Sequence, residues 1–168
     1  MRYSRLRNIT TMLLLVLGSA CTPSHQAMVK PADFTQSQWI RHTTVPGQFE
    51  EVKSFLELAI TDRGIKINNV SHIAEMLKRT GAEVGDETSL YSHGQAIEFC
   101  SATISRAMMK SNAHYISLCP YIIFIYELPQ QPGTIHLSYR NLLVIDANDP
   151  TLQAVDQLLQ DIVSELKQ

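Results

Sequence analysis

Apolar residues recur at the spacing of an amphipathic helix in two long segments of the chain. Residues 48–62 place Phe, Val, Leu, Ala and Ile on one helical face, and Gly64 follows where a helix-ending glycine is expected. The C-terminal segment begins at Asp149 and Pro150, which supply a capping side chain and a proline at the first helical position. These features predict two amphipathic helices.

Weaker helical patterns cover residues 72–79 and 101–110, and the polar segment 81–94 between them predicts a loop. Mixed β-branched and polar residues predict strands at 39–45 and 65–70, and a short alternation predicts another at 97–99.

The strongest strand signal is the unbroken apolar run Tyr-Ile-Ile-Phe-Ile-Tyr at residues 121–126. Because β-branched and aromatic residues dominate it, it predicts a central strand covered on both faces. After a turn at 129–133, apolar and polar residues alternate over 134–140, which predicts a half-buried strand that completes a hairpin. The predicted fold class is α+β, with a mainly antiparallel sheet of about five strands and two to three packed helices.

The first 21 residues have the order of a bacterial export signal. Three arginines precede a short apolar run at 9–17, and small residues then lead to Cys21. The step Leu-Gly-Ser-Ala-Cys at 17–21 resembles a lipoprotein signal, which implies that Cys21 is acylated and becomes the mature N-terminus. Ordinary signal cleavage would cut at the same bond and leave Cys21 as a free thiol.

We therefore expect a signal peptide at 1–20, a lipidated N-terminus and flexible tether at 21–38, and a single α+β domain at 39–168. Thr22 follows the cysteine in place of an aspartate, and in Gram-negative lipoproteins this favours the outer membrane. The expected location is thus the periplasmic side of that membrane, held by the lipid anchor.

Charge excludes one class of partner. The formal net charge is −2, but residues 1–20 hold three arginines and no acid, so the remainder carries −5. Nucleic-acid binding requires clustered lysine and arginine, and no such cluster occurs in the sequence. We expect no nucleic-acid partner.

Short motifs from Phe49 to Asn141 resemble the bacterial family called domain of unknown function 302. They are the helix after Pro46, His93, the step Ile-Glu-Phe-Cys at 97–100, the proline before 122–127, and Tyr-Arg at 139–140. The resemblance implies a small α+β domain, dimeric in at least some members, with no established activity. It therefore leaves a homodimer among the expected partners.

Cys100 and Cys119 are the only cysteines after Cys21. Outside the cytoplasm two thiols usually pair, so one interpretation is a structural disulfide. Cys100 also lies at the start of a predicted helix, where a thiol pKa falls, so a thiol-redox, metal or haem site is the alternative. Two unpaired buried thiols would be the third interpretation.

Three further residues are candidates for ligand binding. His93 lies close to the cysteine region in sequence and, with His114, could complete a metal site, although a loop histidine in water explains it as well. Tyr139 and Arg140 could hold an anionic group, or could be a core tyrosine and a solvated arginine.

No nucleophile, metal-binding or phosphate-loop motif occurs in the sequence. We therefore expect a lipid-anchored periplasmic binding or interaction domain that is non-catalytic and needs no cofactor. Its partners are the membrane and an unknown protein or small molecule. The alternative is a thiol-based or haem- or metal-binding redox protein that uses Cys100 and Cys119.

Overall fold

The structure is a computed structural model that describes residues 38–167. Its strands are β1 (Ile40–Pro46), β2 (Ile67–Ser71), β3 (His93–Phe99), β4 (Tyr121–Glu127) and β5 (Thr134–Arg140). Its helices are α1 (Phe49–Thr61), α2 (Ile73–Val84), α3 (Ala102–Ser111) and α4 (Pro150–Glu165), with short 3₁₀ helices η2 (Ala113–Leu118) and η3 (Leu142–Val144).

The strands form one sheet in the order β1-β5-β4-β3-β2, and every neighbouring pair is antiparallel. The hairpin of β4 and β5 lies at the centre, as the alternation after residue 121 predicts. β1 pairs with the other edge of β5, so His42 and His136 lie side by side although 94 positions separate them in the sequence. The predicted α+β class with a five-stranded antiparallel sheet is confirmed.

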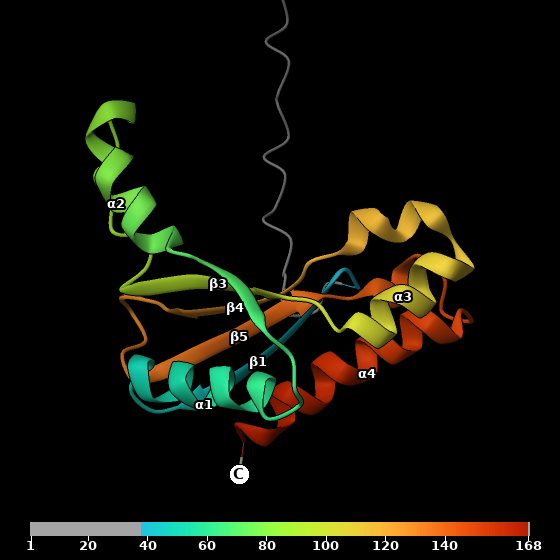
Figure 1. Cartoon of the computed structure of the whole chain (residues 1–168). Coiled ribbons are helices and arrows are strands. Elements are labelled where there is room, and N and C mark those ends of the chain that lie inside the picture. The colour runs from blue at the N-terminus through green and yellow to red at the C-terminus, as the bar shows by residue number, and fades with distance from the viewer. Residues whose placement is uncertain (1–37, 168) are drawn as a thin grey trace, which may run out of the picture. The chain divides into compact units, whose positions relative to one another are not determined.

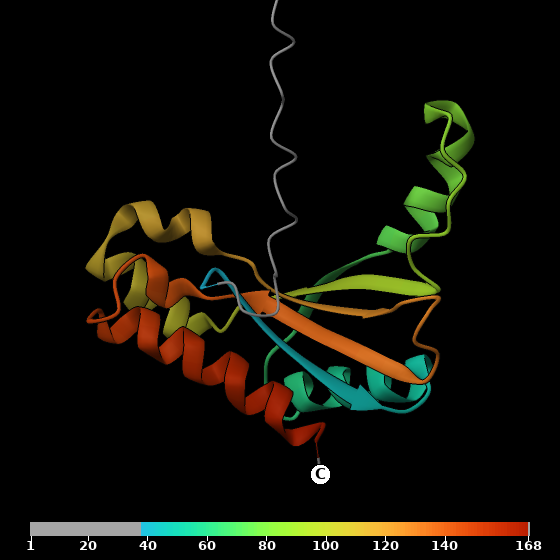
Figure 2. The same ribbon diagram turned by 180° about the vertical axis from the view of Figure 1, so that it is seen from behind.

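The hydrophobic core lies between one face of the sheet and the helices α1 and α4, which lie on the same side of it (Figures 1 and 2). α3 packs against α4 near one end of the sheet. The sheet contributes every second residue of its central strands to this core, and each helix contributes one stripe of apolar side chains. The fully buried residues include Leu56, Ile60, Ile97, Phe99, Ile123, Ile125, Leu137, Leu152 and Ile162.

The opposite face of the sheet has no helical layer over its centre in the described part of the chain. α2 contacts β3 and then projects away from the sheet (Figures 1 and 2). In β4 the residues facing the core are buried, whereas Ile122, Phe124 and Tyr126 on the other face are only half-buried. The prediction that this strand is covered on both faces is therefore wrong. We call this surface the open face.

Two local boundaries also differ from the sequence prediction. α2 continues through Gly81 to Val84 and ends at Gly85, which has the left-handed φ of 73°. Gly81 lies inside the helix, and the position requires glycine because the returning chain passes close to it: a Cβ there would lie 2.6 Å from the Asp86 carbonyl oxygen. β3 begins at His93, inside the segment predicted to be a loop.

The start of α4 matches its prediction. The Asp149 carboxylate accepts hydrogen bonds from the backbone N–H groups of Thr151 and Leu152, and Pro150 occupies the first turn. The side chain thus satisfies two N–H groups that the helix itself leaves without partners.

Candidate functional site

The open face carries a groove with a volume of about 340 Å³. Its walls are largely apolar and include Ile40, Ile73, Tyr91, Phe124 and Tyr126. Ligand-binding pockets are usually concave, mostly apolar and roughly 300–1,000 Å³ in volume. The groove is therefore the best candidate for a binding site in the described part of the chain.

The register of the sheet explains why a groove forms here. Phe124 lies opposite Ser138 of β5 and Ala96 of β3, and Tyr126 lies opposite Gly94. Directly opposed residues of antiparallel strands share a face, so two aromatic rings stand beside very small side chains. The difference in size leaves space over Gly94 of β3 and Ser138 of β5, beside the rings of β4.

A row of rings crosses the open face beside the groove. Tyr126 stacks on His136 with a centroid distance of 4.9 Å and meets Tyr91 edge to face at 5.6 Å. His136 in turn lies next to His42, whose Nε2 atom is 3.0 Å from His136 Nδ1. His136 Nε2 is 2.9 Å from the Oε1 atom of Gln131. The rings are thus held by one another as well as by the strands.

Both histidines are biased toward the neutral form. Burial lowers the pKa of His42 below its ordinary value of 6.5. Burial also lowers the pKa of His136, and the neighbouring charge of His42 adds to the effect. At neutral pH the open face therefore presents uncharged imidazoles.

These lowered pKa values predict that the protein loses stability in acid. Below about pH 6.5 the unfolded chain takes up protons on His42 and His136, whereas the folded chain resists until pH falls through the lowered pKa values. Their contribution is thus fully present above pH 6.5 and is lost across that window. Urea unfolding from pH 7.5 to pH 5 should show this decline, and His42→Gln/His136→Gln should flatten it.

The exposed His114 provides the control for this measurement. His114→Gln should leave the decline unchanged. An identical slope in the double variant and in the unmodified protein would contradict the assignment to His42 and His136.

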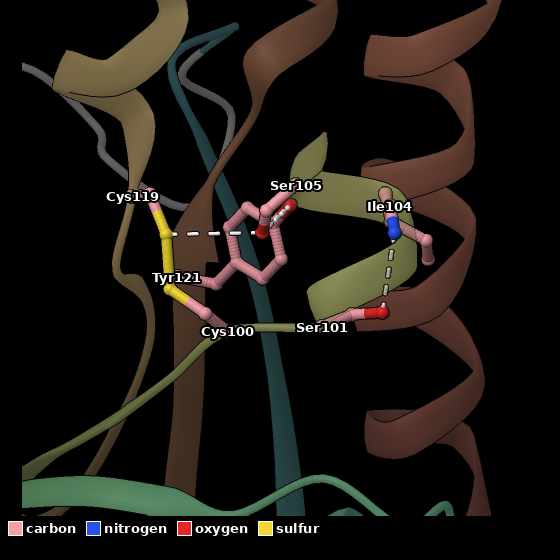
Figure 3. Close-up of a disulfide and its surroundings, with 6 residues drawn as sticks. All are labelled: Cys100, Ser101, Ile104, Ser105, Cys119 and Tyr121. Carbon is pink, nitrogen blue, oxygen red and sulfur yellow. Dashed lines mark hydrogen bonds between the residues drawn. A yellow bond between two sulfur atoms is a disulfide. The ribbon is translucent and has the colours of Figure 1, made fainter. Parts of the chain in front are cut away.

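The two predicted cysteine partners are joined: a disulfide links Cys100 to Cys119 (Figure 3). Cys100 lies between the end of β3 and Ser101, the N-cap of α3, whose side chain accepts from the Ile104 N–H. Cys119 lies just before β4. The bridge therefore ties the start of α3 to the start of the central strand.

Polar side chains pack beside this bridge. The buried Ser105 hydroxyl lies 3.0 Å from the Tyr121 hydroxyl and 3.8 Å from Cys119 Sγ (Figure 3). Burial raises the pKa of Tyr121, so the phenol stays protonated and shares a hydrogen bond with Ser105. Through these contacts the disulfide is part of the packing between α3 and the sheet.

The other sequence candidates lie in separate places. Tyr139 points into the core with 5% exposure, and burial together with the nearby Asp156 charge raises its pKa to about 12. Arg140 is the next residue on the strand, so it points to the opposite face and is exposed. His93 is half-exposed and stacks on Phe49 at 4.7 Å, with its Nε2 atom 3.9 Å from Glu127. The side chains of His93, Tyr139 and Arg140 therefore do not form one site.

The groove residues were not among the sequence candidates. Alternation along β4 and β5 places Phe124, Tyr126 and His136 on one face, which was a usable signal. His42 and Tyr91 gave no comparable signal, because their proximity depends on the pairing of β1 with β5 and on the path of the segment before β3.

Within residues 38–167, no three His, Cys, Asp or Glu side chains lie together in a way that could hold a metal ion. No helix in this range is long and apolar enough to cross a membrane. Cys21, the predicted lipidation site, lies outside the described residues.

The fold defines a class of small α+β domains in which helices cover one face of a five-stranded antiparallel sheet. Residues 41–168 match the family model described as Domain of unknown function DUF302, and the chain belongs to this family.

A solved structure supports the same assignment. It is a crystal structure of an uncharacterized conserved DUF302 protein from Bacillus stearothermophilus, with a TM-score of 0.60 and 18% sequence identity. The match covers 77% of this chain and 97% of that chain, and it establishes the shared fold. No curated protein matches the sequence.

Proposed function

We propose that this chain is a lipid-anchored periplasmic binding domain, without catalysis of its own, that holds a small apolar ligand in the groove on the open face. The observation that carries the proposal is the groove itself: about 340 Å³, lined mainly by aromatic and aliphatic side chains.

The energetics favour an apolar guest. Burial of apolar surface contributes roughly 25 cal/mol per Å², so a ring system that buries about 150 Å² on Phe124 and its neighbours gains about 4 kcal/mol. Hydrogen bonds and contacts with the other lining residues add to this, while association itself costs free energy.

The groove can be tested with N-phenyl-1-naphthylamine, an uncharged probe whose fluorescence rises in apolar surroundings. The chain from Thr22 onward is suitable for this test. The match covers 97% of the solved relative, so in that protein this fold makes up almost the whole chain. We expect saturable binding that Phe124→Ala weakens about tenfold, because the ring is part of the apolar lining of the groove.

The matched control is Phe55→Ala, which removes the same ring from an exposed position on α1. It should leave the affinity unchanged. Equal losses in both variants, or no saturable binding, would overturn the proposal.

The proposed anchor is Cys21, and its support is the leader sequence alone. The protein extracted from membranes should have the mass of residues 21–168 with attached acyl chains, and Cys21→Ala should leave it unacylated. Intact mass spectrometry provides the measurement, and an unprocessed protein of full length would contradict export and anchoring together.

A second copy of the chain is the competing occupant of the open face, since the family resemblance leaves a homodimer expected. Light scattering distinguishes the two. A dimer that dissociates when Phe124→Ala is introduced would assign the open face to self-association.

Redox chemistry at Cys100 and Cys119 is the second candidate function. The observation in its favour is that Cys100 directly precedes the N-cap of α3, where the helix dipole stabilises a thiolate once the bridge is reduced. Thiol titration of the folded protein separates a redox-active bridge from a structural one.

A further inference from the structure

The hydrogen bonds of the histidine pair define which nitrogen carries each proton. The Oε1 atom of Gln131 can only accept, so His136 donates to it from Nε2. In a neutral imidazole the other nitrogen is then an acceptor, so His136 Nδ1 accepts from His42 Nε2 at 3.0 Å. His42 consequently carries its proton on Nε2.

This arrangement leaves His42 Nδ1 as an acceptor that has no hydrogen-bond partner among residues 38–167. His42 also lines the groove. The groove lining therefore includes one imidazole whose orientation is held by a chain of hydrogen bonds from His42 through His136 to Gln131.

The absence of charged side chains in the groove lining narrows the class of ligand further. No Lys, Arg, Asp or Glu lines the groove. Arg140 lies opposite Ile40 on the same face but outside the lining, so a carboxylate or phosphate within the groove would lose water without a charged side chain in the lining to compensate, which is costly in apolar surroundings. An ammonium group would likewise find no carboxylate.

The register also sets the length that a ligand can span. His42, Ser138 and Phe124 lie side by side on three successive strands, with Ser138 in the middle. Neighbouring strands are about 4.8 Å apart, so roughly 10 Å separates the backbone beneath His42 from that beneath Phe124. A two-ring aromatic molecule can lie over the small Ser138 and reach both.

We propose that the groove selects neutral, planar aromatic ligands that carry an O–H or N–H donor, and that His42 Nδ1 accepts this donor while Phe124 contacts the rings. The inference rests on the proposed function and specifies its ligand class.

Three two-ring compounds of similar size test the proposal by calorimetry at pH 7.5 with the chain from Thr22 onward. They are 2-naphthol, which has the donor; 2-methoxynaphthalene, which lacks it; and 2-naphthoate, which is anionic. We expect 2-naphthol to bind about tenfold more tightly than the ether, as a buried hydrogen bond allows. The carboxylate should bind more weakly than 2-naphthol.

His42→Phe removes the acceptor and keeps a ring in place. It should weaken the binding of 2-naphthol about tenfold, to the affinity of the ether, and leave the affinity of the ether itself little changed. Thr44→Val, on the same face of β1 but outside the groove lining, is the matched control and should preserve the preference. Circular dichroism confirms that each variant is folded.

The outcomes separate this inference from the proposed function. Equal affinity for 2-naphthol and the ether, a preference that survives His42→Phe, or tightest binding of 2-naphthoate would overturn the donor assignment while the groove remains a binding site. No binding of any of the three compounds would overturn both.

Discussion

Phe99→Ala should lower the free energy of unfolding by about 3–5 kcal/mol, the largest effect expected from a single substitution in this chain. Phe99 is fully buried at the end of β3 and meets Tyr121 edge to face, with ring centroids 6.2 Å apart. Its removal loses the transfer free energy of the ring and leaves a cavity beneath the helices. Urea unfolding followed by circular dichroism measures the change.

Phe124→Ala is the control, because it makes the same substitution on the opposite face of the sheet. Phe124 is only half-buried, so we expect a loss of about 1 kcal/mol. Similar losses in the two variants would show that the open face is covered in solution, and would contradict the one-sided core.

Removal of the Cys100–Cys119 disulfide should cost about 3 kcal/mol. The bridge spans a sequence separation of 19. A cross-link over a loop of this size lowers the conformational entropy of the unfolded chain, which stabilises the folded state by about 3 kcal/mol. The double variant Cys100→Ser/Cys119→Ser should therefore unfold at lower urea concentration than the oxidised protein. A stability equal to that of the oxidised protein would contradict a structural role for the bridge.

Thiol titration of the folded protein decides between the structural and redox interpretations. A structural bridge should yield no free thiols with mild dithiol reductant until the chain unfolds, because Tyr121 and Ser105 pack beside it. Rapid, reversible release of two thiols from the folded protein would instead favour redox cycling. The Ser105→Ala variant, which keeps both cysteines, shows whether the adjacent hydroxyl affects this protection.

The elements of the fold were largely predictable from local sequence. The apolar stripe over residues 48–62, the cap at Asp149 and the alternation over 134–140 each specify an element through contacts within that element or with its nearest neighbours. One error is local: Gly81 lies inside α2, where the nearby Asp86 carbonyl oxygen leaves no room for a Cβ, and is not a helix-ending glycine. The other depends on distant chain, since no helix among residues 38–167 covers the second face of the apolar strand β4.

The candidate site was less predictable for the same reason. Tyr139 and Arg140 are adjacent in sequence, and this suggested one anion site, but neighbouring residues on a strand point to opposite faces. His42 and His136 are 94 positions apart, and only the antiparallel pairing of β1 with β5 brings their nitrogens within 3.0 Å.

The sequence by itself determined the α+β class, the buried stripes and the cysteines available for pairing, because these follow from hydrophobic periodicity and residue chemistry along the chain. Only the tertiary structure decided which face of the sheet stays open, which rings line its groove and which nitrogen of His42 accepts a hydrogen bond. Those properties depend on strand order and register, and these arise from contacts between segments that are distant in sequence.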